Sequence, residues 1–477
     1  MRRQAMHGNA GLLIDGRLVQ GTATLDVVNP ATGKVFTTVS RATEREAAAA
    51  VAAAKAAQPG WAALELAQRR ALLLRFADEL RDNAEDLAAT LVLEQGKPLA
   101  EARQELQFAE AFVRHIAGLE LPVSLVQDDA THRIELHHKP LGVVTAIAAW
   151  NFPVLIAAYK LAPALLMGNT VVLKPAPTTP VATLQLGAIL ADLLPPGVVN
   201  VITDANDLGS YLTSHPDVAK VSFTGSTATG KKVIASAGPG LKRITLELGG
   251  NDAAIVLDDA DVAEIAPKIF GSAFYNCGQV CLALKRLYVH ASVHDALCDA
   301  LADLAGRAVV GNGAEAGVTM GPLQNAMQYD KAGRFLASAR RDGKILAGGA
   351  LLKGDGYFVA PTIVRDLTDQ SELVAEEQFA PILPVLKFDS IDEAVARANG
   401  TPYGLGGSVW SREEERAYAV AWRLDVGTAW VNHHLHFGPH IPLVGAKESG
   451  VGVEFGPEGL AEYAQLSVIN IARAQVS

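Results

Sequence analysis

The chain has 477 residues, of which 49% are hydrophobic and 19% charged, and its formal net charge is −10. This length exceeds a single hydrophobic core and predicts a globular protein of two to four domains. The negative charge argues against a nucleic-acid-binding surface, and no apolar run is long enough to span a membrane.

The N-terminus and the cysteines predict a cytoplasmic protein. The opening "MRRQAMHGNAG" has two arginines but no hydrophobic segment behind them, so no secretory signal is visible. The three cysteines, Cys277, Cys281 and Cys298, are too few and too clustered for a disulfide framework. We therefore expect reduced thiols.

The first 120 residues predict short strands followed by helices. Residues 12–40 have the turn signals of short strands. Thr43 and Glu46 then have the spacing of a capping box, and alanine-rich helical segments continue to about Leu119.

From Val143 onward the pattern changes to alternating strands and helices. The strands "VVTAIA", "TVVLK", "VVNVIT" and "KVSFT" are separated by helical stretches at 151–167, 180–194 and 206–214. A second series contains "AAIVL", "LYVHA", "PVLKF" and "GTAWVN". Such alternation predicts an α/β protein with two doubly wound parallel sheets, each covered by helices on both faces.

Two strand-like segments fall outside this alternation. They are "HRIELHHKPLG" at 132–142 and the C-terminal "QLSVINIARA". Because exposed strands are usually paired or protected, we interpret both as strands that pair across a subunit boundary. An ordinary edge hairpin is the alternative.

A glycine turn lies inside "VSFTGSTATGKKVI", residues 221–234. Gly225 and Gly230 have the spacing of a nucleotide-triphosphate loop, but Lys232 stands where that loop needs Ser or Thr to ligate magnesium. A turn from strand to helix still suits a pyrophosphate, because its backbone N–H groups are free. Dinucleotide binding and an ordinary crossover turn both remain open from the spacing.

In combination with other motifs, this turn resembles that of the aldehyde dehydrogenase superfamily. The matching segments occur in family order as "PLGVVTAIAAWNFP", "MGNTVVLKPAPTTP", "FTGSTATG", "LELGG", "GQVC", "EEQFAP", "YGLGGSVW" and "GTAWVN". The resemblance implies NAD(P)-dependent oxidation of an aldehyde through a cysteine thioester, in a homodimer or homotetramer. It also implies a Rossmann-type dinucleotide-binding domain (1–121 and 142–249), a catalytic domain (250–450) and a small β oligomerisation domain (122–141 and 464–477).

The resemblance implies three catalytic residues. Cys281 matches the nucleophile, Asn151 the side chain that stabilises the oxyanion, and Glu247 the base that activates water. A thiol near its ordinary pKa is only partly ionised at neutral pH but is strongly nucleophilic. Asn151 also suits a helix N-cap, and Glu247 a structural glutamate. Relatives that transfer the acyl group to coenzyme A often lack this carboxylate, so hydrolysis is favoured and the acylating reaction is the alternative.

The resemblance also implies a dinucleotide site. NAD is weakly favoured over NADP, because Pro177 occupies a position where NAD-preferring relatives often have glutamate and no arginine is added. The expected cofactor-binding residues are Trp150, Lys174, Pro177, Gly225, Ser226, Gly230, Leu248, Glu377 and Phe379.

The expected substrate tunnel is apolar, with a histidine-rich loop at its mouth. The loop "HHLHFGPHIPLVGAKESG" suggests imidazoles that attract a carboxylate or stack on a ring, although solvated loop histidines are equally compatible. A metal site is not expected. With Arg114 and His115 nearby, the sequence predicts an aldehyde with an apolar or aromatic body and a distal polar or anionic group. The expected substrate residues are Phe108, Phe112, Ile156, Tyr159, Val280, Leu282, His433, His434, His436, Phe437 and Leu443.

Overall fold

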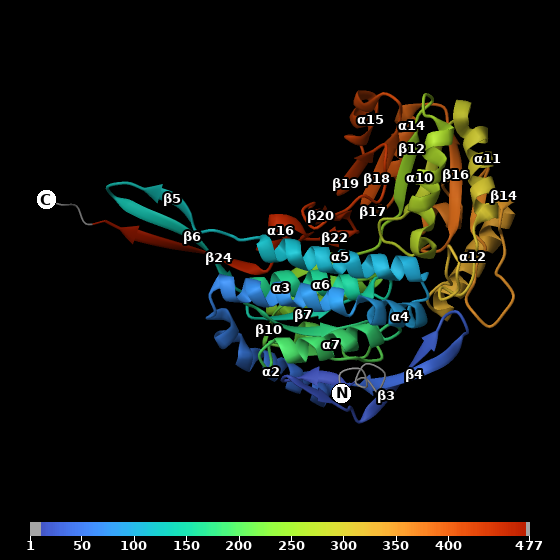
Figure 1. The fold of residues 1–477 in the computed structure, drawn as a ribbon. Coiled ribbons are helices and arrows are strands. Elements are labelled where there is room, and N and C mark those ends of the chain that lie inside the picture. The colour runs from blue at the N-terminus through green and yellow to red at the C-terminus, as the bar shows by residue number, and fades with distance from the viewer. Residues whose placement is uncertain (1–10, 474–477) are drawn as a thin grey trace.

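The structure is a computed structural model that describes residues 11–473, and it contains two α/β bodies and a projecting arm (Figure 1). Residues 1–10 and 474–477, which belong to the predicted N-terminal domain and C-terminal strand, lie outside the described residues.

The first body is built on a sheet of eight strands within the described residues. They are β1 (Leu12–Ile14), β2 (Arg17–Val19), β7 (Val143–Ile147), β8 (Thr170–Lys174), β9 (Val199–Val201), β10 (Val218–Thr224), β11 (Arg243–Glu247) and β22 (Gly450–Val451). Their order is β2-β1-β9-β8-β7-β10-β11-β22. The middle strands β9 to β11 are parallel, as predicted, whereas β1, β2 and β22 are antiparallel edges.

Helices cover both faces of this sheet. One face packs on α6 (Pro153–Leu166) and α7 (Val181–Leu193), and the other packs on α2 (Glu44–Ala62), α8 (Gly209–Ser214) and α9 (Thr227–Ala237). The helices α3 (Leu66–Asp82), α4 (Ala84–Glu94) and α5 (Leu99–Gly118) form a further layer over α6 and α7. Every residue of α6 is buried, because the helix lies between the sheet and α5. This explains why α6 is apolar on all sides.

The second body contains a sheet of seven strands within the described part of the chain. They are β12 (Asp252–Val256), β13 (Leu284–His290), β14 (Lys344–Ala347), β15 (Thr362–Arg365), β16 (Ile382–Phe388), β18 (Gly406–Trp410) and β19 (Thr428–Val431). Their order is β14-β15-β16-β13-β12-β18-β19, and β14 alone among them is antiparallel to its neighbour. Its helices are α10 (Val262–Phe274), α11 (Ala291–Arg307), α12 (Ala326–Asp342), α13 (Glu372–Ala375), α14 (Ile391–Asn399) and α15 (Glu414–Ala421).

Further strands form small sheets outside the two large ones. The described residues contain three two-stranded pairs: β3 (Ala23–Asn29) with β4 (Lys34–Arg41), β17 (Tyr403–Gly404) with β21 (Ala446–Lys447), and β20 (Leu443–Val444) with β23 (Val453–Glu454). After β21 the chain returns to the first sheet, where Gly450 of β22 pairs with Glu247 of β11. The following α16 (Gly456–Ala461) leads into the arm.

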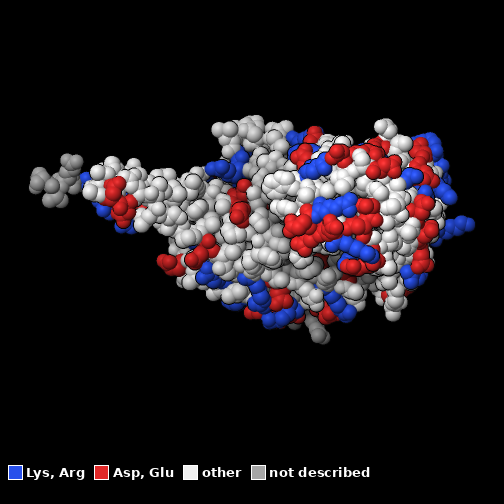
Figure 2. Space-filling view, turned by 90° about the horizontal axis from the view of Figure 1, so that it is seen from above, with Lys and Arg blue, Asp and Glu red and all other residues white. Residues whose placement is uncertain are grey.

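The arm is a sheet of β5 (Ser124–Asp128), β6 (His132–Pro140) and β24 (Ala464–Ala472) that extends away from the body (Figure 1). Both segments that fell outside the predicted alternation form strands, and they pair with each other in one chain, from Ala464 opposite Pro140 to Ala472 opposite His132. They therefore form one sheet within the chain, and pairing of this sheet across a subunit boundary stays a prediction. Figure 2 shows that much of the arm surface is uncharged on the visible face, whereas acidic and basic side chains intermix over the body.

Candidate active site

Two pockets meet at four side chains between the bodies. One pocket, of about 570 Å³, and a second, of about 550 Å³, share Asn151, Thr224, Glu247 and Cys281 in their walls. Asn151, Thr224 and Glu247 lie at or beyond the carboxyl ends of the parallel strands β7, β10 and β11. Ligands of open α/β sheets bind at this edge, which suggests that the shared residues are a reaction centre.

Cys281 and Glu247 are in direct contact. The Glu247 carboxylate accepts a hydrogen bond from the Cys281 thiol, and burial together with this carboxylate raises the pKa of Cys281 well above its usual value. The assumption of an ordinary thiol pKa, made from the sequence, was therefore wrong. Because burial also raises the pKa of Glu247 to about 7, its carboxylate is a suitable acceptor for the thiol proton at neutral pH.

A buried lysine partly offsets the rise in the pKa of Glu247 that burial causes. Lys160 Nζ lies 2.8 Å from Glu454 Oε1 and 2.9 Å from Ser222 Oγ, and its charge lowers the pKa of Glu247. Among the described residues, nothing hydrogen-bonds Glu247 Oε1, so this oxygen is free to accept a proton from a water or substrate.

Asn151 is held on two sides. Its Nδ2 donates to the Gln279 carbonyl over 3.1 Å, and its own backbone carbonyl accepts from Lys97 Nζ over 2.9 Å. An amide nitrogen carries two hydrogens, so one donor remains for a ligand in either pocket. The helix N-cap itself is Phe152, with no side-chain cap bond, so the N-cap alternative for Asn151 is wrong.

A buried carboxylate fixes the helix that follows Asn151. Glu105 Oε1 accepts from the backbone N–H groups of Val154 and Leu155 at the start of α6, and Glu105 Oε2 lies 2.6 Å from Lys97 Nζ. Both charged side chains are completely buried. Lys97 and Glu105 therefore tie α5, the start of α6 and Asn151 into one unit, which the sequence reasoning did not identify.

The first pocket contains the glycine turn. A Cβ atom on Gly225 would lie 2.5 Å from the Phe223 ring, and one on Gly230 would lie 2.5 Å from Leu248. Ser226 caps α9, which begins directly behind the turn. Internal packing thus requires both glycines, and Gly225 and Ser226 line the pocket at a helix N-terminus, which is a suitable place for a pyrophosphate.

Polar and aromatic groups complete the first pocket. Glu377 Oε1 accepts from Gly250 N over 3.1 Å, and the Trp150 and Phe379 rings meet edge to face with their centroids 5.4 Å apart. Gln328 Oε1 is buried here without a partner among the described residues, which marks it as an acceptor for a ligand. Of the predicted cofactor residues, Lys174, Pro177 and Gly230 lie outside the wall of this pocket.

The second pocket is mainly apolar. Of the residues predicted from the sequence to line a tunnel, Ile156, Tyr159, Val280, Leu282, Phe437 and Leu443 are in its wall. The sequence reasoning missed Phe152, Leu155, Thr224, Tyr275, Leu435 and Phe455. Only the aromatic residue in "VEFGP" offered a signal for one of them, because the others lie on elements whose orientation the sequence does not determine.

Five predicted substrate residues do not line the pocket. Phe108 and Phe112 pack behind its wall, each against the Phe437 ring, with centroids 5.5 and 6.3 Å away. The exposed rings of His433 and His436 contact each other, with their centroids 5.4 Å apart. The fifth is His434, which is buried.

His434 is a structural residue of the core rather than a solvated loop histidine. Its Nε2 lies 3.0 Å from the Leu282 carbonyl and its Nδ1 lies 2.9 Å from Ser408 Oγ, and burial lowers its pKa to about 3. Arg114, which the sequence placed near the mouth, lies on α5 and is paired with Asp78 and Glu110. Within the described residues, no Lys, Arg or His lines the second pocket.

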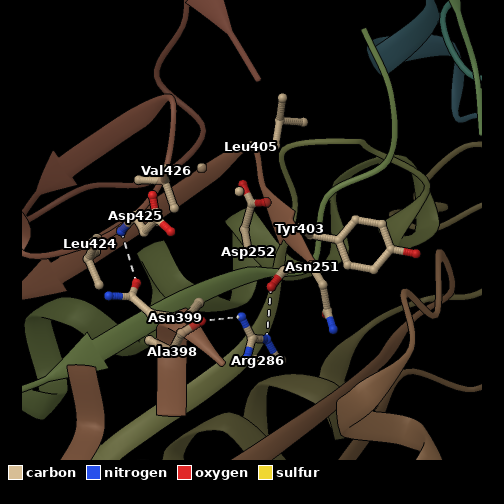
Figure 3. Close-up of a pocket in the computed structure, with 14 residues that line it drawn as sticks. Asn251, Asp252, Arg286, Ala398, Asn399, Tyr403, Leu405, Leu424, Asp425 and Val426 are labelled. Atoms are coloured by element: carbon tan, nitrogen blue, oxygen red, sulfur yellow. Dashed lines mark hydrogen bonds between the residues drawn. The ribbon is translucent and has the colours of Figure 1, made fainter. Parts of the chain in front are cut away.

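A third, small cavity lies next to the nucleophile loop and contains Asp252 (Figure 3). A Cβ atom on Gly250 would contact both Asp252 Oδ1 and the Cys281 carbonyl, so only glycine separates the two. Burial raises the pKa of Asp252 to about 8, which keeps this carboxyl largely protonated at neutral pH. Figure 3 shows Asp252 and Asn251 extending to opposite sides at the start of β12, as consecutive residues of a strand do.

The backbone around the pockets is strained at several non-glycine residues. Asn276 and Cys277, directly before the nucleophile loop, have φ of 49° and 59°. The aromatic residues Phe379 and Phe455, one in each pocket, have φ of 52° and 65°. Such conformations persist where the surroundings enforce them, and they concentrate at functional sites.

Comparison with known proteins agrees with this geometry. The model of the aldehyde dehydrogenase family matches residues 18–469. The chain belongs to this family. It is therefore an oxidoreductase that acts on aldehydes, as the motif resemblance implied, and the expected fold is confirmed.

Individual relatives match the aldehyde dehydrogenase assignment over almost the whole chain. Aldehyde dehydrogenase LUC3 of Fusarium sp is 38% identical over 445 residues, which cover 93% of this chain and 94% of the relative. A mutant aldehyde dehydrogenase from Bacillus cereus superposes with a TM-score of 0.97 at 33% identity, covering 99% of this chain and 98% of the other. Betaine aldehyde dehydrogenase from Staphylococcus aureus, solved with NAD⁺, superposes with a TM-score of 0.96 at 31% identity, covering 100% of this chain and 97% of the other.

We expect Lys97→Met to destabilise this aldehyde dehydrogenase by about 3–5 kcal/mol, because it leaves the Glu105 carboxylate buried without its partner. Urea denaturation followed by circular dichroism measures the change. Arg103→Met is the matched control, because Arg103 lies on α5, as Glu105 does, and its ion pair with Glu85 is exposed. Equal unfolding midpoints for the two variants would contradict the structural role of the buried pair.

Proposed function

We propose that the chain oxidises an aldehyde to the carboxylic acid through a thioester on Cys281, with NAD⁺ as the hydride acceptor and water activated by Glu247. The observation that carries this proposal is the meeting of the glycine-turn pocket and the apolar pocket at Cys281, Glu247 and Asn151. A reducing compartment, which we take to be the cytoplasm, suits a reaction that needs Cys281 as a free thiol. No helix of the described residues is long and apolar enough to cross a membrane.

The contact between Cys281 and Glu247 supports the first step. Glu247 takes the thiol proton as the sulfur attacks the aldehyde carbon, and the carbonyl oxygen becomes the alkoxide of a thiohemiacetal. The remaining N–H of the Asn151 amide and the backbone N–H of Cys281 stabilise this oxyanion. When bound, NAD⁺ supplies the acceptor for the hydride that leaves the thiohemiacetal, which becomes a thioester.

Hydrolysis needs the same carboxylate a second time. Glu247 first releases the thiol proton to solvent, which its pKa of about 7 allows near neutral pH. It then takes a proton from water, the hydroxide attacks the thioester, and the acid leaves as the sulfur recovers a proton from Glu247. The presence of Glu247 supports water rather than coenzyme A as the acyl acceptor.

The first pocket suits the dinucleotide. Gly225, Ser226 and Leu248 line the pocket at the N-terminus of α9, where a pyrophosphate would bind, and Gly230 lets α9 pack closely on Leu248. For the nicotinamide end, the pocket offers the Glu377 carboxylate, the Phe379 and Trp150 rings and the unpartnered Gln328 oxygen.

We expect Glu247→Gln to slow both chemical steps: the first NADH forms slowly because the Cys281 thiol loses its proton acceptor, and later turnover is slower still because water is not activated. In the wild type, the rate of the hydrolytic step should rise with pH through about 7 as Glu247 loses its proton, and the variant should lack this dependence. Stopped-flow absorbance of NADH measures both.

Cysteine variants are the controls for this mechanism. Cys281→Ala should form no NADH, whereas Cys277→Ala, whose side chain is buried beyond the pockets, should retain most of the activity. An active Cys281→Ala enzyme, or acid formation that requires coenzyme A, would overturn the proposal.

A buried ion pair supports NAD rather than NADP. The strand order β9-β8-β7-β10-β11 matches the Rossmann order 3-2-1-4-5, in which the second strand ends at the adenosine ribose. Here that strand, β8, ends at Lys174, whose Nζ lies 2.5 Å from the buried Asp204 Oδ1 behind β9. A 2′-phosphate would therefore meet a lysine that is already neutralised, together with a fixed carboxylate.

We expect Asp204→Asn to raise kcat/KM for NADP⁺ relative to NAD⁺ by about tenfold or more, because one charge-assisted hydrogen bond is worth about 1.5–3 kcal/mol. Initial rates with each cofactor measure the ratio. Asp207→Asn, an exposed carboxylate in the same loop that pairs with Arg41, is the control. An unchanged ratio in Asp204→Asn would show that this carboxylate does not select the cofactor.

The apolar pocket supports an uncharged aldehyde with an apolar or aromatic body. Its wall contains aromatic rings from Phe152, Tyr159, Tyr275, Phe437 and Phe455, and no cationic side chain among the described residues. The anionic group that the sequence suggested thus has no partner in the wall. Catalytic groups lie where the pocket meets the glycine-turn pocket.

We expect kcat/KM to rise at least about tenfold from acetaldehyde to pentanal or benzaldehyde, because each buried methylene contributes about 0.8 kcal/mol. A carboxylated aldehyde of equal length should be a poorer substrate, since its charge would lose water without gaining a partner. NADH absorbance over an aldehyde panel measures these values. A preference for the carboxylated member of each pair would contradict the apolar assignment.

The arm supports a homodimer or homotetramer. Its strands expose Leu125, Val126, Val468, Ile469 and Ile471 to solvent in the single chain. Exposed apolar strand surface of this kind is normally covered by another chain, and a second copy of this chain is the occupant that the family assignment favours.

A further inference from the structure

The loop that carries the nucleophile has four successive carbonyl groups that each accept a hydrogen bond. The donors are Asn151 Nδ2 to Gln279 over 3.1 Å, Ala283 N to Val280 over 3.1 Å, Lys285 Nζ to Cys281 over 2.5 Å and His434 Nε2 to Leu282 over 3.0 Å. Because the N–H and C=O of a trans peptide point in opposite directions, fixing the carbonyls also fixes the amide hydrogens. The direction of every peptide plane from 279 to 282 is therefore determined.

Lys285 differs from the other donors because it is charged and has a second partner. Its side chain is 2% exposed, and its Nζ lies 3.1 Å from Glu377 Oε1 as well as 2.5 Å from the Cys281 carbonyl. Glu377 lines the glycine-turn pocket, whereas Lys285 does not. One buried ammonium thus joins the nucleophile loop to a carboxylate of the cofactor-side pocket.

The contact between Lys285 and Glu377 has a clear physical reason. A buried ammonium is strongly unfavourable unless it is paired and its hydrogens are bonded. Glu377 Oε1 pairs with Lys285 Nζ and accepts a hydrogen bond from Gly250 N. The other carboxylate oxygen, Oε2, is left for a ligand. A displacement of Glu377 must therefore alter the environment of Lys285, and through it the Cys281 carbonyl.

Titratable groups face Cys281 from three strands. Glu247 on β11 and Asp252 on β12 raise the pKa of its thiol, and Lys285 on β13 lowers it. Glu377 pairs with Lys285 and raises the pKa of Glu247, and Lys160 lowers the pKa of Glu247. Lys285 is the cation that lies directly beside the nucleophile loop.

We propose that Lys285 is a positioning residue that fixes the Cys281 peptide and the Glu377 carboxylate together, so that the nucleophile and the carboxylate of the cofactor pocket are held in one arrangement. This inference rests on the roles of Cys281 and Glu377 given under the proposed function. It predicts that loss of the ammonium disturbs two properties at once, namely the reactivity of the thiol and the affinity for NAD⁺.

The test is Lys285→Met, which keeps the length and apolar stem of the side chain and removes the charge. Mass spectrometry follows the rate at which iodoacetamide alkylates Cys281 in the cofactor-free protein at different pH values. We expect the midpoint of this profile to move to higher pH, because the cation that favours the thiolate is lost. Fluorescence titration should show NAD⁺ binding about tenfold weaker, as the loss of one charge-assisted hydrogen bond predicts.

Lys331→Met is the matched control. Lys331 lines the glycine-turn pocket, as Glu377 does, and its Nζ donates to the Glu377 backbone carbonyl over 2.7 Å. None of its hydrogen bonds is to the nucleophile loop. It should leave the alkylation profile in place. Glu377→Gln should move the profile to lower pH, since the ammonium then lacks its counter-charge, and this second variant tests the proposal if Lys285→Met does not fold.

A double-mutant cycle completes the test. The effects of Lys285→Met and Glu377→Gln on the NAD⁺ dissociation constant should be non-additive, because the two side chains act as one unit. Additive effects, or an alkylation profile that Lys285→Met leaves unchanged, would overturn the proposal. Loss of all NADH formation when wild-type Cys281 is alkylated supports the proposed function independently, so failures of the two are distinguishable.

Discussion

Burial of the Glu247 carboxylate against the Cys281 thiol is the interaction on which the rest of the site depends. Burial raises the pKa of both groups, so the thiol remains protonated until a substrate accepts the sulfur, and the carboxylate can take and release protons near pH 7. Two sheets are needed to create this contact, because Glu247 ends a strand of one sheet and Cys281 precedes a strand of the other. The site therefore exists only where the two bodies meet.

Buried lysine–carboxylate pairs recur around this contact. Lys97 binds Glu105 behind Asn151, Lys160 binds Glu454 beside Glu247, Lys174 binds Asp204 at the end of β8, and Lys285 binds Glu377 beside the nucleophile loop. Such pairs add little net stability compared with apolar residues, but a broken pair is strongly unfavourable. In this molecule the pairs orient the groups of the site, because each one holds a backbone group or a carboxylate in one position.

The position of the histidine-rich loop changes the view of the substrate. The sequence places four histidines and an aromatic residue close together, which suggested a polar mouth. In the fold, His434 is buried beneath Leu282, His433 and His436 face outward, and only Phe437 of these reaches the pocket. An apolar wall remains, which favours an uncharged substrate over a carboxylated one.

The sequence alone determined the family, the parallel sheets and the identity of Cys281, Glu247 and Asn151 as candidate residues, because these depend on local motifs and on the alternation of strands and helices. Tertiary structure decided which side chains face a cavity. Phe108 on its helix and His434 in its loop look the same in sequence whether they line a pocket or support its wall. The fold also decided the thiol pKa and the roles of Lys97, Asp204 and Lys285, because burial and ion pairing join residues that are far apart along the chain.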